Sequence, residues 1–148
     1  MYNFKIFTAF LQLADTIPLM NYPVHIKFNT GLNRLGFTEI SITEISNLVN
    51  NQTAVKIASV FSHIAASEDL NERTFTLQQI TTFNTLATKL TNKLSNTPFK
   101  HMLNTSGILN YANEAQFDMV RLGIGLFGFG NEDKYTKQLK NVLTLKSV

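Results

Sequence analysis

Polar and basic residues stand at the ends of four strand-like runs of this chain. They are Asn29 and Thr30, then Ser62 and His63, then Asn104 and Thr105, and finally Arg121. In open parallel sheets and in barrels alike, ligands bind at the carboxyl ends of the strands. Four consecutive polar ends therefore predict one shared site, although a strand also often ends in His or Arg for structural reasons alone.

The elements that must position these groups alternate between helix and strand. Hydrophobic spacing and turn residues predict helices at 4–17, 39–50 and 76–94, strands at 24–29, 54–61 and 99–104, and a strand-like run at 117–121. This order is the pattern of repeated βα units on a parallel sheet. It is compatible both with an open doubly wound sheet and with part of a barrel.

Two capping boxes and an alternating run refine this outline. Ser41 with Glu44, and Thr76 with Gln79, have the spacing that caps the second and third helices. Apolar residues at positions 6, 10 and 13 widen the buried stripe of the first helix. Between positions 24 and 29 apolar and polar residues alternate, so the polar ones are expected to face a barrel interior while the apolar ones face helices.

Composition narrows the class of protein. The chain has 148 residues, 44% of them apolar and 16% charged, with a formal charge of +3. It contains no cysteine, which excludes disulfides, thiolate catalysis and Cys-ligated metal, and no metal site is predicted. No cluster of four basic residues points to nucleic acid, and no apolar run approaches the ~20 residues that span a membrane. We expect a soluble, intracellular protein.

Four segments resemble, in order, motifs of the alanine racemase family. Residues 24–37, VHIKFNTGLNRLGF, resemble VHLKVDTGMxRLGF, and residues 62–69, SHIAASED, resemble SHLAxAD. Residues 104–107, NTSG, and 118–128, DMVRLGIGLFG, resemble the family's N-S/T-A-G/A and DxVRPGIxLYG segments. Ordered motifs at family-like separations are far more specific than any one of them.

The resemblance implies a fold and its boundaries. Members of the family have a (β/α)8 barrel that binds pyridoxal phosphate, followed by a mostly β domain, and the four motifs belong to the second half of the barrel. A complete barrel needs about 250 residues. Residues 1–138 are therefore expected to form part of the barrel, and residues 139–148 to begin the strand that leads into the β domain.

The resemblance also assigns roles at the cofactor ring. Arg121 matches the arginine that points at the pyridine nitrogen, where a cation disfavours protonation of the ring. His63 resembles the histidine that holds this arginine in place. The alternative for Arg121 is an ion pair with Asp118 or with another carboxylate at a strand end.

Two further residues match family positions near the cofactor. Arg34 corresponds to the arginine that hydrogen-bonds the phenolate oxygen. Lys27 corresponds to a lysine that is carbamylated in many members and orients that arginine; a lysine simply paired inside the barrel is equally compatible. The family has Asp where this chain has Asn29, which alters the charge around Lys27.

Phosphate binding is expected from hydroxyls and backbone amides. The resemblance assigns it to Thr105, or to Ser106 if the register differs by one, with the amides of Gly123 and Ile124. Hydroxyls and amides after the last two strands of a barrel commonly converge on a phosphate. The alternative for the glycines is a tight turn.

The implied activity is interconversion of L-alanine and D-alanine for bacterial peptidoglycan synthesis, in the cytoplasm, by a homodimer. The family's two catalytic bases are a lysine of the first barrel strand and a tyrosine of the β domain. Neither has a matching motif in these 148 residues, so the isolated chain is expected to be inactive. The alternatives are a non-catalytic half-barrel that binds a phosphorylated ligand or a partner half-barrel, and a related barrel racemase or decarboxylase acting on another amino acid.

Overall fold

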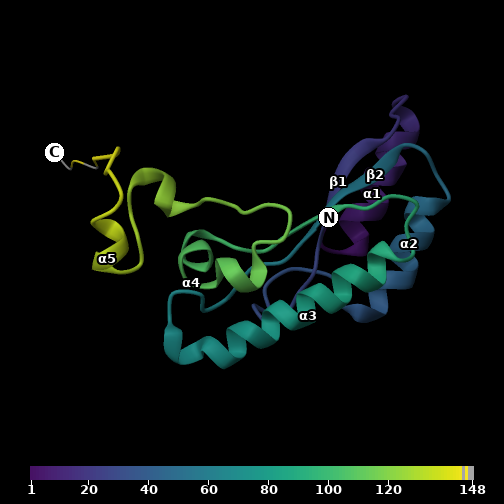
Figure 1. Cartoon of the computed structure of the whole chain (residues 1–148). Helices are drawn as coiled ribbons and strands as arrows, with labels where there is room; N and C mark the ends of the chain where they lie inside the picture. Colours follow the sequence, from purple (N-terminus) through teal and green to yellow (C-terminus); the bar gives the residue numbers. More distant parts are fainter. Residues whose placement is uncertain (145, 147–148) are drawn as a thin grey trace.

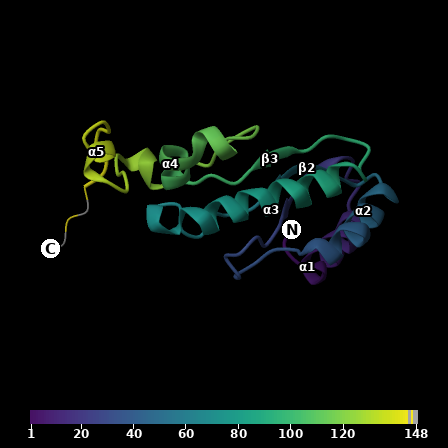
Figure 2. The same ribbon diagram turned by 60° about the horizontal axis from the view of Figure 1, so that its bottom comes forward.

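The computed structural model describes residues 1–144 and residue 146, and it contains a parallel sheet covered by helices on one face (Figures 1 and 2). The strands are β1 (Tyr22–Lys27), β2 (Val55–Phe61) and β3 (Phe99–His101); the α-helices are α1 (Phe4–Thr16), α2 (Ile42–Asn50), α3 (Arg73–Thr91), α4 (Thr105–Ala115) and α5 (Asp133–Thr136), and the 3-10 turns are η1 (Glu39–Ser41), η2 (Leu70–Glu72) and η3 (Ile124–Phe127). No helix of these residues is long and apolar enough to cross a membrane.

The sheet has the order β1-β2-β3, with both pairs parallel. Helix α2 connects β1 to β2, and α3 connects β2 to β3, so the expected βα units are present. The apolar side chains at positions 24, 26 and 28 are buried in the core with those of α2 and α3, whereas His25 is exposed and Lys27 and Asn29 are only partly buried. The predicted alternation along this strand is confirmed.

A β-bulge in β2 decides which side chains of β1 and β2 lie opposite each other. Val24 pairs with Ile57, whereas the next residue of β1, His25, pairs with Ser59, so Ala58 is the extra residue. Bulges re-aim the side chains that follow them. This one places Ser59 opposite His25, where a regular ladder would have placed Ala58.

The predicted strand at 117–121 is not formed as a regular strand. Its backbone runs beside β3, since the Asp118 amide donates to the Lys100 carbonyl (3.1 Å) and the Arg121 amide to the Leu103 carbonyl (3.0 Å). The Asp118 carboxylate accepts the Lys100 amide at 2.7 Å, and Phe117 has φ +50°. A side chain thus replaces a backbone acceptor, which interrupts the ladder, and β3 itself ends at His101 rather than 104.

Neither predicted capping box is present. The Ser41 side chain makes no capping hydrogen bond, because the turn η1 already leads into α2. Helix α3 begins at Arg73, so Thr76 and Gln79 lie inside it, buried against the preceding loop. There the Gln79 side-chain oxygen accepts the Ala65 amide at 3.0 Å. The two residues fasten a loop to the helix instead of starting the helix.

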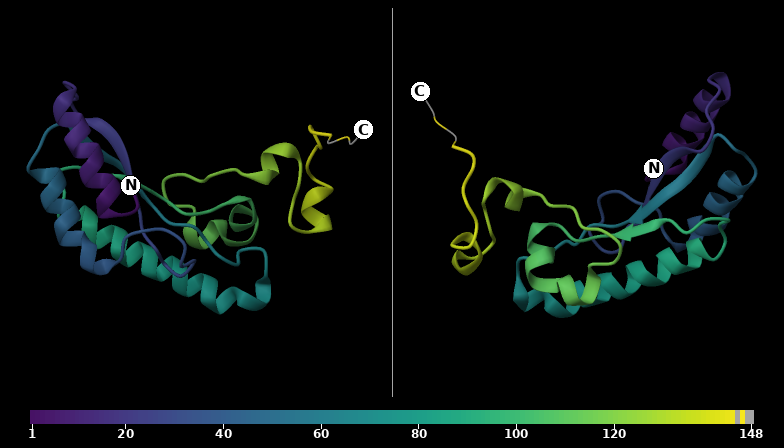
Figure 3. Two further views of the ribbon diagram at one scale, coloured as in Figure 1. Left: turned by 180° about the vertical axis from the view of Figure 1, so that it is seen from behind. Right: turned by 45° about the horizontal axis from the view of Figure 1, so that its top comes forward.

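The first and last segments also differ from expectation. In α1 only Phe7 and Ala14 are buried; Ile6 and Leu13 are 37% and 53% exposed, so the buried stripe is narrower than predicted. Beyond Leu122 the chain extends away from the sheet through η3 and α5 (Figure 3). Residues 139–144 form no strand. The rest of the predicted strand segment, 139–148, includes residues 145, 147 and 148, which lie outside the described residues, and the domain boundary stays a prediction.

Candidate functional site

The carboxyl ends of β1 and β2 are joined by hydroxyl groups. Ser62 Oγ donates to the Phe28 carbonyl at 2.9 Å and lies 2.7 Å from Thr30 Oγ1. A hydroxyl has a single proton to give. Thr30 therefore donates to Ser62, and both hydroxyls are used in holding the two strand ends together.

Arg121 reaches back from the segment beyond β3 to the end of β2. Its Nη2 donates to the Ser62 carbonyl (2.8 Å) and, at longer range, to the Met102 carbonyl (3.4 Å), and lies 3.1 Å from His63 Nδ1. Because an arginine only donates, His63 accepts through Nδ1. The predicted pairing of His63 with Arg121 is present, and the Asp118 carboxylate instead bonds the backbone of β3.

Not every N–H group of the Arg121 guanidinium has a hydrogen-bond partner among the described residues. Its Nε is buried and has no hydrogen-bond partner among the described residues, and the guanidinium packs on the Phe61 ring at 5.2 Å. Burial lowers the pKa of Arg121. Burial, followed by the charge of Arg121, also lowers the pKa of His63. A neutral His63 beside a fixed cation is the resulting arrangement.

Further positive charge gathers around Arg121. Burial and then the charges of Arg34 and Arg121 lower the pKa of Lys27, and the same three cations lower that of His63, while Glu68 acts in the opposite direction. The Asn29 side chain is uncharged and supplies no counter-ion to these cations. Such a group of like charges favours an anionic ligand over an empty site.

Arg34 is carried by a short loop that folds back on the end of β1. The Asn29 side-chain oxygen accepts the amides of Gly31 (3.2 Å) and Asn33 (3.0 Å), which makes Asn29 the anchor of the loop. The Asn29 amide donates to the Phe37 carbonyl at 2.9 Å and closes the loop. The position of Arg34 thus follows from local turn chemistry.

A small cavity lies at the amino terminus of α4. Thr105 Oγ1 accepts the amides of both Gly123 (3.1 Å) and Gly125 (3.0 Å), so its own proton is free to be donated outward. A cavity of about 160 Å³ is lined by Asn104, Thr105, Ser106, Gly123 and Ile124. The predicted phosphate-binding residues therefore line one cavity, beside the positive end of a helix.

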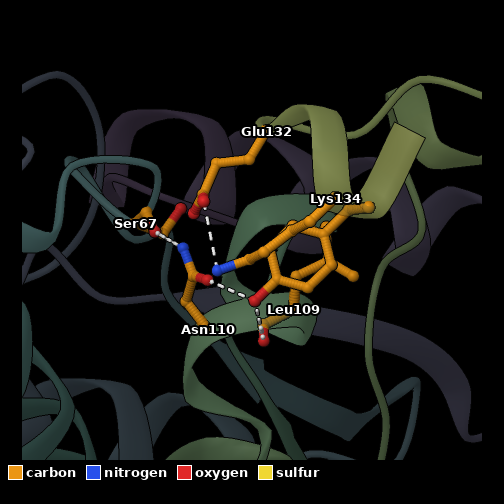
Figure 4. A network of polar contacts seen from close by, with 6 residues as sticks. Ser67, Leu109, Asn110, Glu132 and Lys134 are labelled. Atoms are coloured by element: carbon orange, nitrogen blue, oxygen red, sulfur yellow. Dashed lines mark hydrogen bonds and ion pairs between the residues drawn. The ribbon is translucent and has the colours of Figure 1, made fainter. Parts of the chain in front are cut away.

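A polar network holds α4 in this position (Figure 4). Ser67 Oγ donates to the Asn104 side chain at 2.9 Å, and the Asn110 amide group donates to the Ser67 carbonyl at 2.9 Å. The Tyr135 hydroxyl lies 3.2 Å from the Asn110 oxygen, and Lys134 pairs with Glu132 at 3.1 Å. The loop after β2, α4 and α5 are thereby fixed to one another.

His101 is a buried residue beside the site that the sequence analysis did not single out. Its ring stacks on Phe61 at 5.1 Å with an interplanar angle of 4°, and its Nε2 lies 3.0 Å from Ser59 Oγ. A signal was present in the sequence: His25, Ser59 and His101 are polar residues within three neighbouring strand-like runs. The bulge that brings Ser59 and His25 together has no such signal.

The buried His101 makes the stability of the folded chain depend on pH. Burial, then the charges of Arg121 and His25, lower its pKa to about 4. A histidine in the unfolded chain has a pKa of about 6.5. Between that pH and about pH 4 the unfolded chain therefore binds more protons than the folded chain, and the free energy of unfolding decreases as the pH falls. We expect the melting temperature to fall by several degrees within this range. His101→Gln should remove much of this slope, the remainder coming from His63; an unchanged slope would contradict the assignment.

These features define a class of protein: a chain of parallel βα units of the barrel type, with a group of cations at its strand ends and a cavity of about 160 Å³ at a helix amino terminus. Residues 9–130 match the profile described as the N-terminal domain of alanine racemase. The chain belongs to the alanine racemase family.

Curated relatives and solved structures agree with this assignment. The chain is 35% identical to an alanine racemase of Fusobacterium nucleatum over 130 residues, covering 86% of this chain and 35% of that protein. It is 42% identical to one of Thermodesulfovibrio yellowstonii over 113 residues, covering 74% and 28%. The chain thus spans about a third of the length of these relatives.

The fold resembles solved alanine racemases. One from Streptomyces lavendulae superposes with a TM-score of 0.84 at 18% identity, covering 95% of this chain and 38% of that one. One from Bartonella henselae, solved with covalently bound pyridoxal phosphate, gives 0.76 at 22% identity, covering 95% and 39%. The predicted partial barrel of parallel βα units is confirmed.

Proposed function

We propose that this chain is the part of an alanine racemase that binds pyridoxal phosphate through its strand ends. Two observations carry the proposal: the charges of Arg34 and Arg121 act on Lys27, and Gly123, two residues after Arg121 in the chain, lines the Thr105 cavity. The residues fit the cofactor, because the buried Arg121 Nε has no acceptor among the described residues and the cavity lies at a helix amino terminus. The cofactor, when bound, supplies an electron sink for charge at the substrate α-carbon.

In this proposal Arg121 would hold the pyridine ring at its nitrogen and would disfavour a proton there. Its Nη2 donates to the Ser62 carbonyl and to His63, so the guanidinium keeps its orientation although no carboxylate among the described residues pairs with it. A cation without a carboxylate partner is the arrangement that disfavours a proton on a neighbouring nitrogen. His63 is a positioning residue for Arg121.

We assign the phosphate to the Thr105 hydroxyl and the Ile124 amide, and a substitution series tests this. The Gly123 amide, which the sequence also predicts as a phosphate ligand, donates to Thr105 Oγ1 at 3.1 Å instead. Thr105→Val keeps the shape but leaves the amides of Gly123 and Gly125 without their acceptor, so we expect a loss of about 1–3 kcal/mol in unfolding free energy and weaker binding of pyridoxal phosphate. Ser106→Ala should change the affinity for pyridoxal phosphate less than Thr105→Val does.

Equilibrium binding and urea unfolding of both variants decide the register. Thr85→Val, on the exposed side of α3, is the control for the substitution itself. A larger affinity loss in Ser106→Ala would move the assignment from Thr105 to Ser106.

Arg34 would face the phenolate oxygen, and Lys27 is a candidate for carbamylation. Its lowered pKa increases the free amine that adds CO₂, with release of one proton, and the carbamate anion would attract Arg34 and Arg121 where the ammonium repels them. We expect a carbamate carbon signal by NMR in ¹³C-bicarbonate at pH 8, absent in Lys27→Met and retained in the exposed control Lys56→Met. No signal in the wild type would leave Lys27 as an unmodified lysine.

The substrates we propose are L-alanine and D-alanine, the product serving peptidoglycan synthesis, in a cytoplasmic homodimer whose barrel includes residues 1–138. The two bases are expected outside the matched segments, so the 148 residues alone should form no D-alanine. A chimera tests the proposal: residues 9–130 replace their counterparts in the Fusobacterium nucleatum relative. Racemisation that depends on Arg121 supports it. A folded chimera that binds the cofactor but does not racemise alanine would favour the non-catalytic alternative.

A further inference from the structure

Three polar side chains, one from each strand, form a hydrogen-bonded chain across the sheet. His25 Nδ1 lies 2.6 Å from Ser59 Oγ, and the same oxygen lies 3.0 Å from His101 Nε2. Ser59 and His101 are buried. The β-bulge at Ala58 creates this contact by placing Ser59 opposite His25. The roles proposed above for the cofactor ligands use none of these three side chains.

The two distances indicate which way the protons point. Hydrogen bonds donated by a hydroxyl are shorter, at about 2.7 Å, than those donated by N–H, at about 2.9–3.0 Å. The shorter distance to His25 and the longer one to His101 match an arrangement in which Ser59 donates its single proton to His25 Nδ1 and accepts from His101 Nε2–H. In that arrangement the buried His101 Nδ1, which has no partner among the described residues, is a lone pair and not an unpaired donor.

The same ring is linked to the ligand site through Phe61. His101 stacks on the Phe61 ring, and the Arg121 guanidinium packs on that ring as well. The charged or titratable groups that act on His101 are Arg121, beyond β3, and His25, from β1. A proton on His101 Nδ1 would give the His101 ring a positive charge. Because this ring stacks on Phe61, as Arg121 does, that charge would repel Arg121.

We propose that Ser59 and His25 are positioning residues that hold His101 uncharged, with its proton on Nε2, so that Arg121 keeps its place on Phe61. The inference rests on the proposed function only in taking Arg121 as a cofactor ligand. The contacts of Ser59 with His25 and His101 are present without any ligand.

The first test uses the 148-residue chain without ligand. Long-range ¹H–¹⁵N correlation spectra of labelled histidine at pH 7 should show a neutral His101 protonated on Nε2. His25→Leu removes the acceptor of the Ser59 proton, so Ser59 is then free to donate to His101 Nε2 and the proton should move to Nδ1. His25 is exposed, so the variant is expected to fold. A wild-type His101 protonated on Nδ1, or an unchanged tautomer in His25→Leu, would overturn the proposal.

The second test follows Arg121. Ser59→Ala should shift the Arg121 Nε–H signal and raise the Kd for pyridoxal phosphate about five-fold, the effect of one lost hydrogen bond. Ser46→Ala removes another buried hydroxyl, bonded to the Thr43 carbonyl within α2, and should do neither. An unmoved Arg121 signal in Ser59→Ala contradicts the inference. If the wild type binds no pyridoxal phosphate, the proposed function fails while the tautomer and the Arg121 signal still decide this inference.

Discussion

Replacing Arg121 with alanine is expected to raise the Kd for pyridoxal phosphate at least tenfold, about the loss of one charged hydrogen bond, and to destabilise the chain by about 2 kcal/mol. The second effect arises because the Ser62 carbonyl and His63 Nδ1 both lose the donor Nη2. Binding is measured by cofactor absorbance and stability by urea unfolding. Arg121→Lys should recover charge but only part of the affinity, since it lacks the planar fork.

The matched control is Arg73→Ala. Arg73 also pairs with one side chain, Glu114, and packs on an aromatic ring, Tyr111, but it lies at the start of α3. It should leave cofactor affinity unchanged. Equal losses of affinity in the two variants would show that the effect of Arg121 is not specific to the site.

Replacing Gly36 with alanine is expected to cost about 3–5 kcal/mol and to abolish ordered placement of Arg34. Gly36 has φ +141°, and a Cβ there would lie 2.4 Å from the Asn29 nitrogen and 2.5 Å from the Phe28 carbonyl carbon. Both are backbone atoms of the strand end, so neither can move aside without breaking the closure between Asn29 and Phe37.

Circular dichroism and urea unfolding measure this effect. Gly123→Ala is the control for folding, because its Cβ would meet only Thr105 Oγ1, at 3.5 Å. If Gly36→Ala were as stable as Gly123→Ala, the loop would not have the backbone conformation described here.

The three parallel strands could be predicted from sequence, although not their exact ends, because hydrophobic patterning and polar terminators are local features. The same locality explains the errors. Thr76 and Gln79 match a capping box in spacing, but their partners lie in the preceding loop, and contacts with that loop decide where α3 begins. At 117–121 the Asp118 carboxylate takes the amide that a regular ladder would use, which no periodicity reveals.

Contacts among the candidate site residues could be predicted for residues that stand in motifs and not for those that depend on strand register. Arg121 and His63 are brought together as expected. His101 was missed because its importance comes from Ser59, and Ser59 reaches it only through the bulge at Ala58. A one-residue change of strand register is a tertiary feature that hydrophobic patterning leaves undetermined.

The central claim is that the strand ends of this chain form one site for pyridoxal phosphate. Titration of the ¹⁵N-labelled chain with pyridoxal phosphate, followed by NMR, tests it most directly. We predict saturable shifts that share one Kd at the Arg121 Nε–H, at the Ile124 amide and in the loop that carries Arg34. Shifts that do not saturate, or that are confined to residues away from these three places, would contradict the claim.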